Sequence, residues 1–299
     1  MAWDAGGQYM KFTQMGRRRF LKSTGAVAAA VLVGSRFLDA ASLDKPIGLQ
    51  LYSVRDLLPK DFDGTLHQLS AAGYKEVESA GYFNKTAAEF RKAMDGAQLR
   101  CISGHYTLAL LRSQLDELME YAHTVGLEYL ICSSSGGVHR DANAKGEQTL
   151  DDWHYIAEEF NRIGAKVKAA GMTFGMHNHV PEFAVKDGVI VYDELLRLTD
   201  PQYVVFEMDC GWVTAAGHNP VDYLSKTPER FPLLHVKDMA RTPDGKYHSV
   251  VMGKGVADYH AILKAATGLK HYFIEQEEFV GDPMTELGED ADYMRKLDV

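Results

Sequence analysis

The chain has 299 residues, of which 46% are hydrophobic and 24% are charged, a composition typical of a soluble globular protein. It carries 32 basic and 41 acidic residues, a formal net charge of −9, and an acidic surface of this kind repels the phosphate backbone of nucleic acids. Composition and charge therefore exclude a low-complexity chain and argue against a nucleic-acid-binding protein.

The N-terminal segment, residues 1–41, has the features of a twin-arginine signal peptide and linker. The run Arg17-Arg18-Arg19-Phe20-Leu21-Lys22 precedes a short apolar stretch at 25–33, and small residues follow near Ala40. This stretch has about half of the ~20 residues that a membrane-spanning helix needs, so we expect no stable membrane span after signal cleavage. An uncleaved or lipid-tethered form is the main alternative. The resemblance to twin-arginine signals implies a periplasmic or secreted protein, exported after folding.

Cleavage of this signal would make the protein more acidic. Residues 1–41 hold six basic and two acidic residues, so residues 42–299 retain 26 basic and 39 acidic residues, a formal charge of −13. We therefore expect no nucleic-acid partner and a small-molecule substrate. The three cysteines, Cys101, Cys132 and Cys210, are odd in number and lie in or beside apolar segments, which predicts buried thiols rather than disulfides or a zinc cluster.

Residues 42–299 alternate short apolar, β-branched runs with longer amphipathic stretches, a pattern typical of βα repeats and a parallel sheet. Eight strands are predicted in chain order, at 47–52, 75–78, 99–103, 129–133, 172–178, 203–208, 233–236 and 272–275. Helices are predicted at 62–72, 86–96, 111–125, 149–170, 192–199, 219–226, 256–267 and 284–297. Gly73, Gly126, Gly171 and Gly268 follow predicted helices, where glycine can adopt the left-handed conformation that ends a helix.

Eight strands in about 250 residues match the size of a (β/α)8 barrel. No Pro/Ser-rich linker divides the chain after residue 46. We therefore predict a single (β/α)8 TIM barrel over residues 42–299. A doubly wound open sheet is the alternative, and it is weakened because no GxGxxG phosphate-binding loop follows the first predicted strand.

The C-terminal ends of the predicted strands carry the side chains of a candidate site, because in a barrel these ends meet at one mouth. In chain order they present Gln50 and Tyr52, Glu78, His105, Ser133, His177-Asn178-His179 with Glu182, Glu207 with Asp209, His235 with Lys237-Asp238, and Glu275 with Glu277. A single histidine or carboxylate at a strand end is more often a salt-bridge partner or a solvated polar group. Four consecutive strands that end in metal-type ligands indicate a metal site instead.

The chemistry of these groups suits a divalent metal ion. Two carboxylates with one or two imidazoles meet the charge and hardness demands of Mn²⁺, Mg²⁺, Zn²⁺ or Co²⁺ and leave positions open for substrate oxygens. Burying the same charges without a metal would be costly. Cysteine is not expected as a ligand, because alternation along the strand turns Cys210 away from the barrel axis when Asp209 faces it.

The order and spacing of six segments resemble the xylose isomerase-like TIM barrel family of sugar phosphate isomerases and epimerases. The segments are Gly48-Leu49-Gln50-Leu51-Tyr52-Ser53, Ser103-Gly104-His105, His177-Asn178-His179-Val180-Pro181-Glu182-Phe183, Met208-Asp209-Cys210-Gly211-Trp212-Val213, Leu234-His235-Val236-Lys237-Asp238 and Ile274-Glu275-Gln276-Glu277. The resemblance covers nearly the whole chain after the signal. It implies a metal held by one residue from each of strands five to eight, usually Glu, Asp, His and Glu.

Carried onto this chain, the last three ligand positions of the family fall on Asp209, His235 and Glu275. The first falls on His177, because this chain has His177-Asn178-His179 where many relatives have Glu-Asn-His. A neutral imidazole can still ligate the metal, but the site then lacks one carboxylate and one potential base.

The resemblance implies an isomerase or epimerase that transfers a proton beside a metal-bound carbonyl of a sugar, keto-sugar or cyclitol. Glu275 can serve as both ligand and base, with Glu182 or His179 as its partner. Lys237 is a candidate for neutralising an oxyanion, although a surface lysine paired with Asp238 is an equal alternative. Gln50, Glu78, His105, Trp212 and Glu277 are predicted to bind the substrate, with Trp212 offering an apolar face to a sugar ring.

Three other functions compete with this prediction. A lyase or hydratase that cleaves 3-keto-glycosides by β-elimination would use the same metal site and needs only one base. An exported sugar-binding protein normally has two lobes and a hinge, which the sequence does not show. An apurinic endonuclease shares the barrel but needs extra histidines, and Asp209-Cys210-Gly211-Trp212 lacks a histidine three residues after the aspartate. Whether the chain forms a homo-oligomer is left open.

Overall fold

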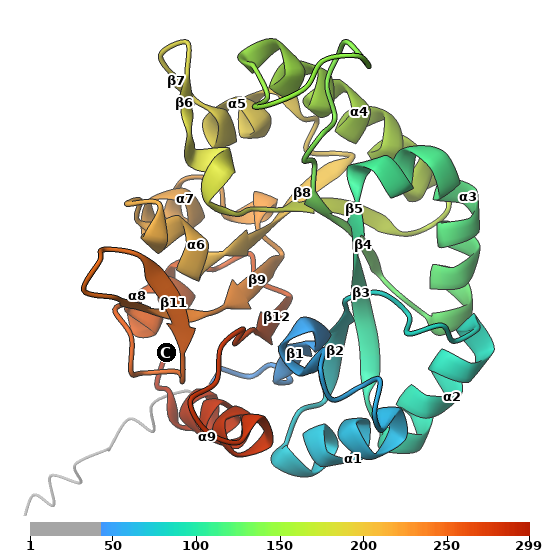
Figure 1. Ribbon diagram of the computed structural model, residues 1–299, viewed down its shortest axis with the longest axis vertical. Coiled ribbons are helices and arrows are strands. Elements are labelled where there is room, and N and C mark those ends of the chain that lie inside the picture. Colours follow the sequence, from blue (N-terminus) through green and yellow to red (C-terminus); the bar gives the residue numbers. More distant parts are fainter. Residues whose placement is uncertain (1–42) are drawn as a thin grey trace, which may run out of the picture. The chain divides into compact units, whose positions relative to one another are not determined.

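The computed structural model describes residues 43–299, and the predicted export signal lies outside the described residues. In the described part, eight parallel strands close into a barrel in the order β1-β12-β9-β8-β5-β4-β3-β2 (Figure 1). Their bounds are β1 Gly48–Gln50, β2 Glu76–Ser79, β3 Arg100–Thr107, β4 Tyr129–Ser134, β5 Thr173–His177, β8 Val204–Asp209, β9 Leu233–Val236 and β12 His271–Ile274. The predicted (β/α)8 barrel is confirmed.

Helices surround the barrel in Figure 1. They are α1 Phe62–Ala72, α2 Ala87–Ala97, α3 Leu108–Val125, α4 Leu150–Ala169, α5 Val191–Leu198, α6 Cys210–Ala215, α7 Pro220–Lys226, α8 Tyr259–Ala265 and α9 Pro283–Lys296. Short 3-10 turns are η1 Leu51–Val54, η2 Val180–Phe183 and η3 Pro228–Arg230, and two hairpins pair β6 Val185–Lys186 with β7 Val189–Ile190 and β10 Asp238–Arg241 with β11 Tyr247–Val250. None of the helices in residues 43–299 is both long and apolar enough to cross a membrane.

Helix ends follow local sequence signals, with one exception. Gly73, Gly126 and Gly171 adopt the left-handed conformation after α1, α3 and α4, with φ of 105°, 91° and 82°. The prediction for Gly268 is wrong, because α8 ends at Ala265, its C-cap residue Ala266 has a φ of −79°, and Gly268 does not adopt the left-handed conformation. Gly268 serves close packing instead, since a Cβ there would lie 2.0 Å from the carbonyl oxygen of Pro228.

Three further local differences from the sequence prediction concern the mouth of the barrel. The first strand ends at Gln50 because the chain turns into η1, and the helix expected at 256–267 begins only at Tyr259. The helix α6 was not predicted, and it starts at Cys210 directly after β8. All three cysteines are buried free thiols, as predicted.

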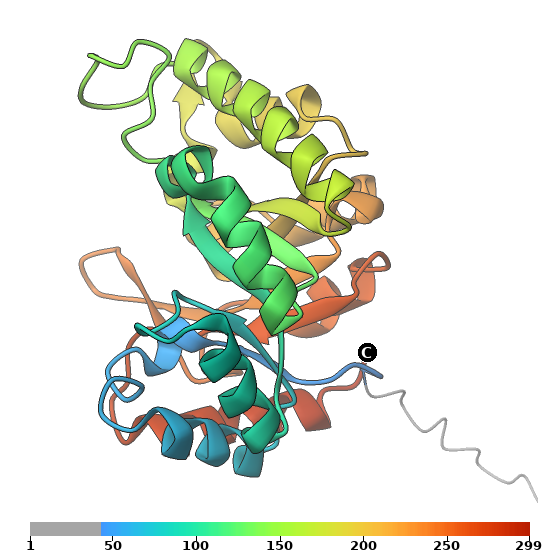
Figure 2. The ribbon, with the colours of Figure 1, turned by 90° about the vertical axis from the view of Figure 1, so that its right-hand side faces the viewer.

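The packing separates an outer and an inner core. The outer core lies between strands and helices and contains most of the buried apolar residues. A small inner cluster consists of Ile102, Tyr129, Ile131, Leu233 and Phe273, with Val205 packed against it. These side chains come from β3, β4, β8, β9 and β12, so they fill the barrel interior with apolar groups. Figure 2 shows the segment after β4 and the β10–β11 hairpin extending from the same end of the barrel.

Candidate metal centre

The inward-facing rows of three strands change from apolar to charged toward the mouth. Because every second residue of a strand faces the same side, Val205 is followed by Glu207 and Asp209 on β8. In the same way, Leu233 is followed by His235, and Phe273 by Glu275. The alternation that builds the apolar interior therefore also stacks carboxylates and an imidazole above it.

Four of these mouth residues bring their donor atoms together. One donor atom each of His177, Asp209, His235 and Glu275 lies within 4.8 Å of the other three, and all four residues are buried. Asp209 Oδ2 lies 3.9 Å from His177 Nε2 and 3.9 Å from His235 Nδ1. His235 Nδ1 lies 3.0 Å from Glu275 Oε2. These separations suit four ligands of one divalent ion.

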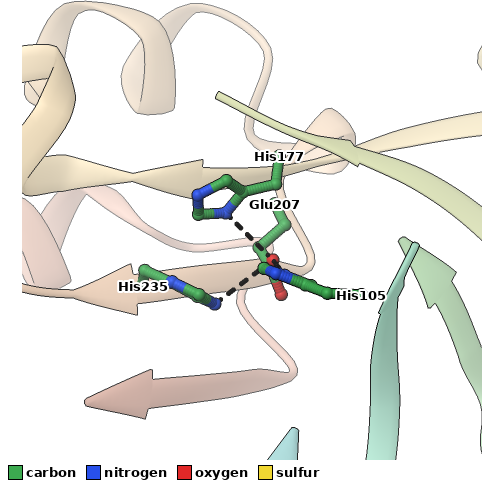
Figure 3. Close-up of side chains that lie close together, drawn as sticks. All are labelled: His105, His177, Glu207 and His235. Atoms are coloured by element: carbon green, nitrogen blue, oxygen red, sulfur yellow. Dashed lines mark hydrogen bonds and ion pairs between the residues drawn. The ribbon is translucent and has the colours of Figure 1, made fainter. Parts of the chain in front are cut away.

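Behind the two imidazoles lie two further carboxylates. His177 Nδ1 lies 3.1 Å from Glu207 Oε2, and His235 Nε2 lies 2.6 Å from Glu78 Oε2 and 3.2 Å from Glu207 Oε2. Figure 3 shows His177, His235 and His105 grouped around Glu207. A histidine that ligates a metal usually donates its other ring N–H to a carboxylate, which sets its tautomer and orientation. Glu78 and Glu207 stand where such partners are needed.

A second group of potential ligands shares two of these histidines. It consists of His105, His177, Glu207 and His235, and it would use the opposite ring nitrogens. Both sets reach the main cavity, because His105 and His177 line it as well as Glu275. The mouth-side set supplies two carboxylates, Asp209 and Glu275, whereas this group has one, and two carboxylates better balance the charge of a divalent ion. We therefore assign His177, Asp209, His235 and Glu275 as the candidate ligands, with Glu78 and Glu207 as supports.

Two buried carboxylate oxygens of the centre are candidates for contact with a bound cation. Among the described residues, Glu207 Oε1 and Asp209 Oδ2 are buried without a hydrogen bond that meets geometric criteria, although Asp209 Oδ2 has an ion pair with Lys237 Nζ at 3.2 Å. Burial acts to lower the pKa of His235, but Glu207 and Glu275 outweigh it and raise that pKa above its usual range. Buried polar atoms without partners are costly, so these oxygens fit the donor set of a bound ion.

Lys237 is buried inside the centre rather than on the surface. Its Nζ lies 3.2 Å from Asp209 Oδ2, 2.8 Å from Glu275 Oε2 and within hydrogen-bonding distance of Glu277. Burial acts to lower the pKa of Lys237, but Asp209 and Glu275 outweigh it and raise the pKa, so the ammonium stays charged. The ammonium also lies 4.7 Å from the centre of the Trp212 ring.

A main cavity of about 860 Å³ opens over this centre. A volume of this size accommodates a small-molecule ligand. Among its lining residues are His105, His179, Glu182, Trp212 and Glu277. Burial followed by the charge of Lys237 lowers the pKa of His179 to about 4, so its imidazole is neutral at pH 7. Burial raises the pKa of Glu182 to about 7, so this carboxyl can hold a proton near neutrality.

A model of the family described as "Xylose isomerase-like TIM barrel" matches residues 66–297. The chain belongs to this family. The family match supports the sequence resemblance carried by the strand-end motifs.

Similar proteins carry several activities. An inosose dehydratase of Clostridium beijerinckii is 24% identical over 208 residues, which cover 65% of this chain and 69% of the relative. A sugar phosphate isomerase/epimerase from Parabacteroides distasonis has a TM-score of 0.69 and 27% identity, covering 89% of this chain and 97% of that one. The 3-keto-D-glucoside 4-epimerase of E. coli has a TM-score of 0.64 at 13% identity, covering 85% and 100%, and therefore shows the fold alone.

The structure places the five residues predicted to bind substrate in two groups. His105, Trp212 and Glu277 line the main cavity. Gln50 and Glu78 have no exposed surface and do not line it. Gln50 Nε2 donates to Glu78 Oε2 at 2.7 Å, and the same oxygen lies 2.6 Å from His235 Nε2. The pair therefore supports His235 rather than facing the cavity.

Sequence reasoning gave no role to two residues that hold the centre together. Asn178 exchanges two hydrogen bonds with the backbone of Asp209, at 3.1 and 3.2 Å, and so ties the end of β5 to the end of β8. Tyr259 hydrogen-bonds both backbone groups of Lys237, at 2.7 Å each. The position of Asn178 between two candidate site histidines could have indicated its role. No sequence motif indicated a role for Tyr259.

Proposed function

We propose that this protein is a divalent-metal-dependent isomerase or epimerase of an unphosphorylated sugar, keto-sugar or cyclitol. The observation that carries the proposal is the convergence of donor atoms from His177, Asp209, His235 and Glu275 within 4.8 Å at the base of the main cavity. An ion such as Mn²⁺, Mg²⁺, Zn²⁺ or Co²⁺ held there supplies a Lewis acid that polarises a substrate oxygen.

Glu275 is the best-placed base for the carbon beside the substrate carbonyl. Burial acts to raise its pKa, but Lys237 and His235 outweigh it and lower the pKa well below its usual range, so the carboxylate is ionised. Its side chain lines the main cavity. Lys237, held against the same carboxylate, places a positive charge where negative charge develops on the substrate.

Proton-carrying groups also stand on the other side of the centre. His179 and Glu182 follow β5, whereas Glu275 follows β12, and β8 and β9 separate these strands in the barrel. Epimerisation requires a proton to leave one face of a carbon and return to the other. The neutral His179 imidazole and the Glu182 carboxyl supply the second position that this chemistry needs.

The lining of the main cavity argues for a substrate without phosphate. Among the described residues that line it there is no arginine or lysine. The nearby cation, Lys237, is engaged by three carboxylates. Phosphate groups are commonly bound by arginine or lysine, so this lining favours a neutral sugar.

Elimination is a second candidate, favoured by His177. Because an imidazole replaces the strand-five carboxylate, only Glu275 among the proposed ligands faces the cavity as a carboxylate. Glu182, with its pKa raised to about 7, can protonate a leaving group. A metal-dependent lyase or hydratase acting on 3-keto-glycosides would use this arrangement, and relatives named inosose dehydratase support it.

Solvent deuterium exchange tests the shared first step. The metal-loaded protein in D₂O is expected to introduce deuterium beside the carbonyl of a 3-keto-glucoside, and Glu275→Gln is expected to lower this rate by about 10²–10⁴-fold. Inverted stereochemistry without release of the aglycone identifies an epimerase, and released aglycone identifies a lyase. Undiminished exchange in Glu275→Gln would contradict the proposal. An exported sugar-binding protein would give no exchange at all.

A further inference from the structure

A second cavity of about 600 Å³ adjoins the main cavity, and we call it the side cavity. Gly136, Gln148, Trp153 and Pro181 line both cavities. The two spaces therefore adjoin at these four residues, and a ligand that extends from the metal centre into the side cavity would pass them.

The walls of the side cavity are held in place by specific contacts. One wall is the segment after β4, and Gln148 Nε2 donates to the carbonyl oxygens of Ser135 and Val138 at 2.8 and 3.0 Å within it. The other wall is the segment from Val180 to Lys186 after β5. Lys186 Nζ lies 3.0 Å from Glu147 Oε2, so an ion pair joins the two walls.

The chemistry of the side cavity differs from that of the main cavity. Its side chains include the apolar groups of Trp153, Val180, Pro181, Phe183 and Ala216. Among the described residues that line it, the charged groups are Lys186 and Glu147, and these are paired with each other. Phe183 is fixed by packing against Tyr192, at 4.7 Å between ring centres. Such a space binds an uncharged apolar group better than a hydrated sugar.

We propose that the side cavity binds an apolar, aromatic aglycone, so that the substrate is a glycoside whose sugar lies at the metal centre. The inference rests on the proposed function, because it takes the sugar end as given. The inference applies to both candidate reactions, because an epimerase would bind the aglycone and keep it, whereas a lyase would bind the aglycone and release it. It adds a substrate class that the metal ligands alone do not specify.

Binding of two unreactive sugars tests the inference. Methyl β-D-glucoside and phenyl β-D-glucoside lack the carbonyl, so they bind without reacting, and their Kd values are measured by calorimetry on the Mn²⁺-loaded protein. Burying a phenyl ring is expected to make phenyl glucoside bind about 10- to 100-fold more tightly than methyl glucoside.

Two valine variants provide a matched pair. Val180 lines the side cavity and is 43% exposed, whereas Val185 is 65% exposed on the same segment and does not line it. Val180→Glu places a charge in the apolar wall and is expected to remove most of the preference for phenyl glucoside while leaving methyl glucoside unaffected. Val185→Glu is expected to preserve the preference. Unchanged thermal unfolding in both variants verifies that they fold.

The outcomes separate this inference from the proposed function. Equal Kd values for the two glucosides, or a preference that survives Val180→Glu, would overturn the side-cavity inference. Deuterium exchange into a 3-keto-glucoside would in that case still support the proposed function. If neither glucoside binds and no exchange occurs, the proposed function fails and the inference fails with it.

Discussion

Glu207 has no exposed surface, yet its Oε2 lies within 3.2 Å of nitrogens from three histidines. We assign it the task of orienting the imidazoles of His177 and His235. Glu207→Gln keeps the shape but replaces an acceptor oxygen with a donor, so it is expected to lower metal affinity by about 10–100-fold. Competitive titration with a fluorescent chelator measures the change.

The control for this variant is another buried carboxylate bonded to a histidine. Glu76 is on β2, and its Oε2 lies 2.8 Å from His271 Nδ1, away from the proposed ligands. Glu76→Gln is expected to leave metal affinity unchanged. Equal losses in both variants would mean that Glu207 acts on barrel stability rather than on the metal centre.

The sequence predicted the mouth residues better than their supports. The positions of Asp209, His235 and Glu275 at strand ends follow from periodicity, and the barrel topology brings such ends together. Glu78 was also found at a strand end, but its bond to His235 joins residues 157 positions apart across the barrel interior. Sequence spacing carries no signal for such a contact, so Glu78 was predicted to face a substrate.

At the scale of elements, the helix α6 helps to position Asp209 and Lys237 in the metal centre. Asp209 is its N-cap, with Oδ1 accepting from the Trp212 N–H at 2.9 Å. Gly211 allows the helix to approach β9, because a Cβ there would lie 2.6 Å from the carbonyl oxygen of Lys237. Gly211→Ala is expected to lower the free energy of unfolding by about 1–3 kcal/mol and to weaken metal binding.

A second helical glycine serves as the comparison. Gly96 lies in α2, and a Cβ there would meet nothing within 4 Å. Gly96→Ala is expected to raise the free energy of unfolding by up to about 1 kcal/mol without changing metal affinity. Chemical denaturation and metal titration of both variants measure these effects. A stable Gly211→Ala variant with full metal affinity would show that the close approach of α6 is not needed.

Most helices and strands could be predicted because they belong to regular βα repeats, whereas the short elements in the irregular connections could not. The eight barrel strands follow from short apolar runs, and α1 matches its predicted bounds of 62–72. The helix α6 is only six residues long and starts without a break after β8, so it lacks a separate apolar period. The short hairpins β6–β7 and β10–β11 were missed for a similar reason, since two- and four-residue strands barely alternate.

Asp290 on α9 makes the packing of this helix sensitive to pH. Its Oδ1 accepts from the Met252 N–H at 2.7 Å, and burial raises its pKa to about 7. The folded state therefore keeps a proton that the unfolded state releases near pH 4, so stability from this group falls as pH rises from about 4 to 7. Asp290→Asn is expected to reduce this loss by on the order of 1–3 kcal/mol, measured as the free energy of unfolding at several pH values. Parallel pH profiles of the two proteins would rule out this role.

At the scale of the whole molecule, a bound ion is expected to stabilise the barrel. The four proposed ligands come from four different strands, so an ion binds the folded state in preference to the unfolded one. At a hundredfold excess of metal over its Kd the gain is about 2.7 kcal/mol, and a chelator is expected to remove it. Asp209→Asn, which retains a good N-cap residue, is expected to show a much smaller gain in thermal unfolding experiments. A gain equal to that of the unaltered protein would exclude Asp209 as a ligand.

The closure of the barrel gives this metal centre a place in the order of folding. Glu275 follows β12, the strand that pairs with β1 and so joins the last strand of the barrel to the first. A growing chain that has exposed His177, Asp209 and His235 still lacks the fourth ligand. If these four residues bind an ion as proposed, its complete capture would have to wait until the C-terminal strand docks, and ion retention would then report a finished barrel.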